Sequence, residues 1–244
     1  ATKYRIAQYD TFRDKAKTDY LTRQIIKAKL ESQINFLKST NHPEILANIS
    51  KLEKSGISEA VSSRHYFDNY SKLIDERFGF KKRNSVRIEK KNATDVINAL
   101  LNYGYSVLAG QISAYINGVG LDAYYGIMHK NHSSFQSLVY DMMEPFRWLV
   151  DYSVWKLSDA KSRNRISKKQ YAHTREGIVV LEYDLIRKFL ELLERTFQKE
   201  MKYAYRHGAF TKNGLKSVQE ITIAKILVQN LAEFCTGKQK EFRI

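Results

Sequence analysis

GIMHKNHSSFQSLVYDMMEPFR, residues 126–147, is the stretch around which the rest of the chain is organised. Its polar run Lys130–Ser137 predicts a loop, and its apolar run Leu138–Met143 predicts a helix. Asp141 and Glu144 are three residues apart, so on a helix their side chains point to the same side. Because both acids stand among apolar residues, we expect that side to face a core.

Carboxylates that face a core need a positively charged partner, since burying an unpaired charge is costly. His129 precedes the two acids, and an imidazole with carboxylates is a common ligand set for magnesium, manganese or zinc. A surface feature or a satisfied polar cluster is the commoner explanation of one histidine near two acids. The spacing by itself therefore leaves a metal site and a polar cluster open.

The longer run Gly120–Arg147, GLDAYYGIMHKNHSSFQSLVYDMMEPFR, resembles the signature of the CRISPR-associated adaptation integrases, a family of metal-dependent endonucleases. In that family a G-L-D-x-x-x-G-x-x-H turn is followed by an S-L-x-x-D-x-x-E-P-F-R helix. The resemblance runs from residue 20 to the end of the chain and is strongest over residues 95–151. The matching positions of the signature are Gly120, Leu121, Asp122, Gly126, His129, Ser137, Leu138, Asp141, Glu144, Pro145, Phe146 and Arg147.

Glu59 has two interpretations. With Ser58 as N-cap, it stands in the first turn of a helix, where the helix dipole favours a negative charge; this predicts a capping role only. The family carries its first metal-binding glutamate in a G-I-E-G-x-x-A-x-x-Y-F pattern, which Glu59, Tyr66 and Phe67 fit. The resemblance thus implies that Glu59 is a metal ligand and that Tyr66 supports the site. The departures from the pattern are the small residues Ser58, Ala60 and Ser63.

The helix that contains NALLNYGY, residues 98–105, closely resembles the family's "asparagine-alanine-leucine-leucine" helix. Asn98 and Asn102 are four residues apart and share one face of that helix. They could support the active site through hydrogen bonds, and buried structural amides are the equal alternative.

The formal net charge is +15, from 41 Lys and Arg against 26 Asp and Glu. An excess this large predicts a polyanionic partner, nucleic acid first and an anionic membrane second, with a surplus for solubility as the alternative. No apolar window is long enough for a transmembrane helix, and the start ATKYRIAQYD has no signal peptide. Cys235 is the single cysteine, which favours a reducing interior. We expect a cytoplasmic protein without membrane association.

Two basic runs are candidates for contact with DNA phosphates. Residues 80–91, FKKRNSVRIEKK, lack helical periodicity and predict a loop, as does the polar stretch 158–169. Solvated loops are the alternative. The candidate DNA-binding residues are Lys81, Lys82, Arg83, Arg87, Lys161, Arg163, Arg165, Lys168 and Lys169.

The fold is expected to be all-α, because only Pro43 and Pro145 can break helices and no run of alternating β-branched residues predicts a strand. We expect a single multi-helix catalytic domain over residues 1–244, which could be divided into two lobes. The family's small β-rich N-terminal domain is not evident, so the chain is either a fragment or a divergent branch. Helices are predicted over residues 11–37, 43–56, 59–67, 95–118, 138–143, 147–157, 178–206 and 215–234.

The resemblance implies a metal-dependent DNA integrase and endonuclease. The terminal hydroxyl of a short DNA duplex would attack a phosphodiester in a CRISPR repeat, and the same site would cleave branched DNA. Glu59, His129 and Glu144 would hold Mg²⁺ or Mn²⁺, with Asp141 as a second carboxylate, either a ligand or a base. The resemblance also implies a homodimer joined by a small companion adaptation subunit.

Two rival functions stay open. One is a transposase-like integrase of a mobile element from the same family, because the motifs are shared. The other is a non-catalytic helical nucleic-acid-binding protein, which would bind DNA without the three ligands. A carboxylate-bridged di-iron bundle is excluded, since the sequence contains no Glu-x-x-His motif.

Overall fold

The computed structural model describes residues 2–54, 59–83, 93–129, 135–159, 162, 165–204, 215–242 and 244. Within them the all-α prediction is confirmed: helices dominate, and strands form two short antiparallel hairpins. Several positions named above lie outside the described residues, namely residue 56 at the end of the helix predicted over residues 43–56, Ser58, Arg87, residues 130–134, Lys161 and Arg163.

The chain forms two compact units. Unit 1 comprises Ala1–Ile25, Ala109–Phe146 and Glu194–Ile244, and unit 2 comprises Ile26–Leu108 and Arg147–Leu193. The prediction that residues 1–244 act as one domain stays a prediction.

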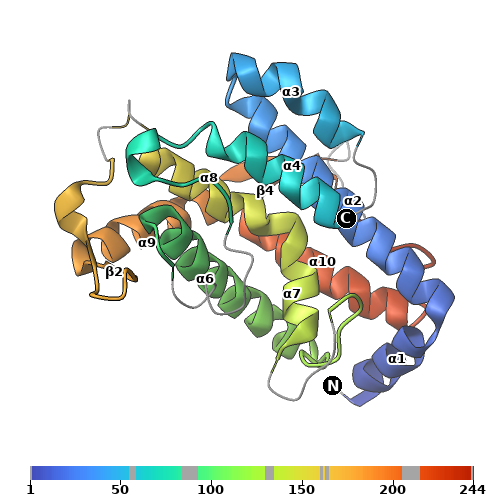
Figure 1. The fold of residues 1–244 in the computed structure, drawn as a ribbon. Helices are drawn as coiled ribbons and strands as arrows, with labels where there is room; N and C mark the ends of the chain where they lie inside the picture. The colour runs from blue at the N-terminus through green and yellow to red at the C-terminus, as the bar shows by residue number, and fades with distance from the viewer. Residues whose placement is uncertain are drawn as a thin grey trace. The chain divides into compact units, whose positions relative to one another are not determined.

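Figure 1 shows the helices and hairpins along the chain. The two hairpins pair β1 (Tyr171–His173) with β2 (Val179–Leu181), and β3 (Glu200–Ala204) with β4 (Leu215–Gln219). The 3-10 turns are η1 (Glu76–Phe78), η2 (Glu144–Phe146) and η3 (Lys168–Gln170). The helices are α1 (Thr2–Arg13), α2 (Lys15–Ser39), α3 (Pro43–Glu53), α4 (Glu59–Ser71), α6 (Val96–Val119), α7 (Ser137–Met143), α8 (Arg147–Ser158), α9 (Tyr183–Phe197) and α10 (Glu220–Cys235).

In unit 1, α1 packs side by side with α10 (Figure 1) and holds the turn that follows α6. The fully buried Gln8 donates from its side-chain nitrogen to the carbonyl oxygens of Asp122 and Tyr125, both at 2.9 Å. Its side-chain oxygen accepts the N–H of Asp122 at 2.7 Å. The turn begins at Gly120, whose φ of 93° ends α6 in the conformation that glycine adopts most easily. Gln8 therefore anchors the turn that leads to His129.

In unit 2, α6 approaches its neighbours so closely that a side chain at Gly104 would not fit. A Cβ atom there would lie 2.5 Å from Cγ1 of Val150 on α8 and 2.8 Å from Cζ of Phe189 on α9. The α3 and α4 helices pack together in the same unit. Glycine in the middle of α6 thus serves close helix packing and costs helix propensity.

The single long helix predicted over residues 11–37 is wrong at its start. The chain instead forms α1 and α2, which are separated at Asp14. The Asp14 side chain accepts the N–H groups of Ala16 at 3.0 Å and Lys17 at 3.2 Å, as a helix N-cap does. A new helix therefore begins there although neither proline nor glycine marks the break.

The helices predicted over residues 178–206 and 215–234 are wrong at their ends. Strand β2 precedes α9, β3 follows it, and β4 occupies the residues before α10. Each strand is three to five residues long. Runs this short cannot be assigned to strand or helix from periodicity, because their pairing partners lie elsewhere in the sequence.

The remaining predicted helices are confirmed. The α3 helix begins at Pro43, and Pro145 falls in η2 between α7 and α8. Among the described residues, no helix combines the length and the apolar character needed to cross a bilayer.

Candidate active site

Asp141 on α7 is completely buried and is surrounded by N–H donors from the turn that ends at His129. The backbone N–H groups of Ile127 and Met128 donate to its Oδ2, the latter at 3.1 Å. The backbone N–H of His129 donates to its Oδ1 at 3.1 Å. These hydrogen bonds compensate the desolvation of the carboxylate.

The imidazole of His129 is oriented by the same carboxylate. Its Nδ1 lies 2.6 Å from Asp141 Oδ1. Because the Asp141 oxygens act as acceptors, Nδ1 carries the proton, and Nε2 is the ring nitrogen with a lone pair for a metal. A carboxylate that orients a histidine in this way is typical of metal-binding histidines.

Gly126 makes this arrangement sterically accessible. A Cβ atom at this position would lie 2.6 Å from Ser137 Cβ and 2.8 Å from Asp141 Oδ2. Only a glycine lets the backbone of the turn approach the start of α7 so closely. This contact gives a physical reason for a glycine three residues before His129.

Glu144 begins η2 directly after α7 and is almost completely buried. His129, Asp141 and Glu144 belong to unit 1, whereas Glu59 belongs to unit 2. In the part of the chain that the structure describes, no group of three or more His, Cys, Asp or Glu side chains is placed to hold one metal ion. The ligand set Glu59, His129 and Glu144 stays a prediction.

Glu59 begins α4 and forms an ion pair with Lys29 on α2, both within unit 2. The Nζ atom of Lys29 lies 3.0 Å from Glu59 Oε1 and 3.4 Å from Ser63 Oγ. Lys29 is buried, with 5% of its surface exposed. The sequence interpretation did not select Lys29 as a site residue, although a cation inside the apolar stripe of α2 was the available signal.

Asn98 and Asn102 bind Arg83 inside unit 2. The guanidinium of Arg83 donates to Asn98 Oδ1 at 2.7 Å and to Asn102 Oδ1 at 2.9 Å. The side-chain nitrogen of Asn98 donates to Asp95 Oδ2 at 2.7 Å. Burial lowers the pKa of the Arg83 guanidinium from its ordinary value. This geometry agrees with the alternative of structural amides and places Arg83 in the same network.

Tyr66 is fully buried, and its hydroxyl donates to Asp151 Oδ2 at 2.6 Å. Asp151 was not selected from the sequence. Its available signal was an acid within the apolar run of α8, and similar apolar surroundings drew attention to Asp141 and Glu144.

The candidate DNA-binding residues that the structure describes divide by exposure. Lys81 and Lys82 are exposed, whereas Arg83 is half-buried. Arg165, Lys168 and Lys169 are also exposed. The exposed cations can be reached by phosphates, and their contact with DNA stays a prediction.

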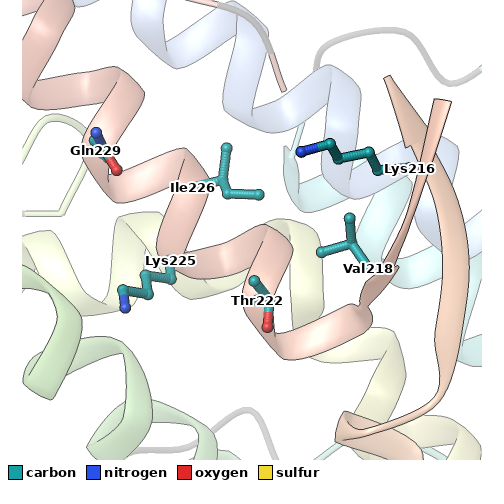
Figure 2. A pocket seen from close by; sticks show the side chains of 6 residues that line it. All are labelled: Lys216, Val218, Thr222, Lys225, Ile226 and Gln229. Carbon is teal, nitrogen blue, oxygen red and sulfur yellow. The ribbon is translucent and has the colours of Figure 1, made fainter. Parts of the chain in front are cut away.

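Unit 1 carries a further basic feature, a groove of about 370 Å³ between β4 and α10 (Figure 2). Two of its six lining side chains are lysines, one on the strand and one on the helix. Figure 2 shows the helix residues following one another along α10, with the strand residues beside them. The lining residues are Lys216, Val218, Thr222, Lys225, Ile226 and Gln229.

The chain is similar to known proteins in both sequence and fold. Residues 1–195 match the family described as "CRISPR associated protein Cas1". A CRISPR-associated endonuclease Cas1 from Archaeoglobus fulgidus is 30% identical over 203 residues, which cover 67% of this chain and 59% of the relative. The chain thus spans less than two thirds of the length of this relative.

Solved structures show the same likeness. A casposase bound to integration product aligns with a TM-score of 0.80 and 26% identity, over 99% of this chain and 67% of the casposase. A Cas6-RT-Cas1–Cas2 complex aligns with a TM-score of 0.77 and 19% identity, over 99% of this chain and 26% of that one. Since the family match covers well over half of the residues, this chain belongs to the Cas1 family of CRISPR-associated proteins.

Proposed function

We propose that this chain carries the helical catalytic part of a metal-dependent DNA integrase and endonuclease. The observation that supports it best is the pairing of His129 with the buried Asp141, which orients the imidazole as a ligand. The names of similar proteins agree with this reaction class, since the relative is called an endonuclease and the casposase is bound to an integration product.

The donor set fits Mg²⁺ or Mn²⁺. Glu59, His129 and Glu144 would supply two carboxylates and one imidazole nitrogen. When bound, a divalent ion would polarise the phosphodiester and stabilise the charge that develops during attack. Asp141 is proposed as a positioning residue, because its oxygens already accept three backbone N–H groups and the His129 Nδ1.

The proposed reaction is a transesterification. The terminal hydroxyl of a short DNA duplex forms a bond to phosphorus in a CRISPR repeat, and the bond from phosphorus to the leaving 3′ oxygen breaks. The leaving oxygen takes up a proton, and the attacking hydroxyl loses one. Hydrolysis of branched DNA uses water in place of the hydroxyl. Exposed cations, among them Lys81, Lys82, Lys168 and Lys169, would hold the DNA backbone.

We further propose that the chain works as a homodimer with a small companion subunit of the Cas2 kind. The similar fold in a Cas6-RT-Cas1–Cas2 complex supports such an assembly. The second candidate function is integration of a mobile element, which the likeness to the casposase supports. The target separates the two: a CRISPR integrase prefers a repeat-containing plasmid, whereas a mobile-element integrase does not.

The test is strand transfer of a labelled short duplex into plasmids with and without a repeat, with and without Mg²⁺ or Mn²⁺. We expect joining only when the metal is present. His129→Ala should lower the rate at least about 100-fold, because it removes the oriented nitrogen ligand. DNA affinity and the thermal midpoint should change little, since the three backbone N–H groups still compensate Asp141.

The matched control is His173→Ala, which removes an exposed histidine on β1. This variant should join DNA at the wild-type rate. A His129→Ala variant that joins DNA as fast as wild type in the presence of metal would overturn the proposal and favour the non-catalytic binding protein.

A further inference from the structure

Asp151 on α8 is a completely buried carboxylate that the proposed reaction does not use. Tyr66 donates to its Oδ2 at 2.6 Å, and Tyr105 donates to its Oδ1. The hydroxyl of Tyr70 donates to the backbone oxygen of the same residue at 2.9 Å. Tyr66 and Tyr70 come from α4 and Tyr105 comes from α6, so one residue of α8 joins three helices of unit 2.

The tyrosines that bind Asp151 are themselves buried. Tyr66 and Tyr70 are fully buried, and Tyr105 is 7% exposed. Arg147 precedes Asp151 by about one turn of α8, and its guanidinium lies 4.2 Å from the centre of the Tyr105 ring. Burial raises the pKa of the Asp151 carboxyl. The hydroxyls of Tyr105 and Tyr66 and the charges of Arg147 and Arg83 oppose that shift.

Burying a carboxylate between helices carries a desolvation penalty. Apolar side chains of similar volume often stabilise a core as well or better. The advantage of a buried carboxylate is that its hydrogen bonds depend on direction and distance. Each tyrosine hydroxyl must meet the carboxylate at hydrogen-bond distance, so the contacts fix the register of α4 and α6 against α8. Apolar contacts tolerate sliding, whereas this network does not.

The register of α4 matters because of what else that helix carries. Glu59 stands seven residues before Tyr66, which is two helical turns, so the two side chains lie on the same side of α4. The α8 helix in turn begins at Arg147, joined through η2 to Glu144 without an intervening loop. The hydrogen bonds of Asp151 therefore connect α4, which carries Glu59, to α8, which follows Glu144 in the chain.

We propose that Asp151 is a positioning residue of the integrase site, which acts through Tyr66 on Glu59 and through the start of α8 on Glu144. The inference rests on the proposed function, because it assumes that both glutamates are metal ligands. In this proposal Asp151 acts without contacting the metal or the DNA. Loss of its hydrogen bonds should let α4 shift, whereas metal–ligand distances tolerate a change of only about 0.2 Å.

The experiment measures the Mn²⁺ dissociation constant by calorimetry and strand transfer at saturating Mn²⁺, for Asp151→Asn and Tyr66→Phe. The matched control is Tyr20→Phe, which removes a tyrosine hydroxyl that binds Phe242 in unit 1. All assays run well below the thermal midpoint of each variant. We expect both network variants to bind Mn²⁺ about tenfold more weakly and to join DNA about tenfold more slowly, with the control unchanged.

The outcomes separate the inference from the proposed function. If wild type binds no Mn²⁺, the proposed function fails. If wild type binds Mn²⁺, and the network variants bind it as tightly as Tyr20→Phe does, only the positioning role is overturned. Tyr66→Phe decides alone should Asp151→Asn not fold, because it deletes a single hydroxyl and keeps the ring and its packing.

Discussion

At the scale of single residues, the buried carboxylates of Asp141 and Asp151 are compensated by different kinds of hydrogen-bond donor. Asp141 accepts three backbone N–H groups and the His129 Nδ1, so it stabilises a turn and orients a ring. Asp151 accepts two tyrosine hydroxyls, so it joins helices. The partners decide the role: backbone donors fix a local loop, whereas side-chain donors from distant elements fix the packing.

Asp141→Asn tests the role of the first aspartate. The amide offers one oxygen and an NH₂ group, so at least one buried N–H of the turn loses its acceptor, at a cost of about 1–3 kcal/mol in the free energy of unfolding. An NH₂ facing Nδ1 would also move the imidazole proton to Nε2, which removes the lone pair proposed to bind the metal. We expect a lower urea midpoint and weaker Mn²⁺ binding.

Asp14→Asn is the control for that substitution, because asparagine caps α2 as well as aspartate does. Equal stability and equal Mn²⁺ affinity of the two variants would show that Asp141 positions nothing.

At the scale of elements, helix identity follows from local signals and helix packing from close approach. Pro43 begins α3, and Asp14 caps α2. The α6 helix places Gly104 where α8 and α9 leave no room for a Cβ atom. The same helix has Gly110, around which no atom lies within 4 Å of an added Cβ.

Gly104 and Gly110 of α6 should therefore respond in opposite directions to alanine. Gly104→Ala gains helix propensity, about 1 kcal/mol, and loses more through overpacking against Val150 and Phe189, about 1–3 kcal/mol. We expect a net loss of stability in urea unfolding. Gly110→Ala, the control on the same helix, should gain about 1 kcal/mol. A Gly104→Ala variant as stable as Gly110→Ala would mean that the helices separate without cost.

At the scale of the whole molecule, the excess of positive charge predicts association with a polyanion, for which DNA is the proposed partner. A net charge of +15 attracts a polyanion from any direction, so affinity by itself says little about where DNA binds. The salt dependence of binding is more informative, because each lost phosphate contact lowers the slope of log K against log salt by about 0.9 on duplex DNA.

The double variant Lys81→Ala/Lys82→Ala should bind duplex DNA more weakly, with a salt slope smaller by about 1.8 if each lysine contacts one phosphate. Titrations across a range of salt concentrations measure both quantities. Lys15→Ala/Lys17→Ala removes the same charge from α2, where these lysines pair with Asp19 and Asp14. Identical slopes for the two double variants would show that residues 81 and 82 lie in a solvated loop.

The sequence by itself determined the features that depend on neighbours along the chain. Helical periodicity with Pro43 and Pro145 was enough to predict α3, α6, α7 and α8, and the signature around His129 was enough to predict the family. The charge balance predicted a polyanionic partner. Such signals work because backbone conformation within a helix is set over a few residues.

Only the tertiary structure decided what depends on residues far apart in sequence. Strands β3 and β4 pair across the residues between them, and a run of five residues carries no record of its partner. Asp141 and Asp151 look alike in sequence, because each is an acid within an apolar run. The first meets donors within fourteen residues, whereas the second meets Tyr66 from 85 residues away. A buried charge takes its role from the partners that compensate it, and only folding brings those partners together.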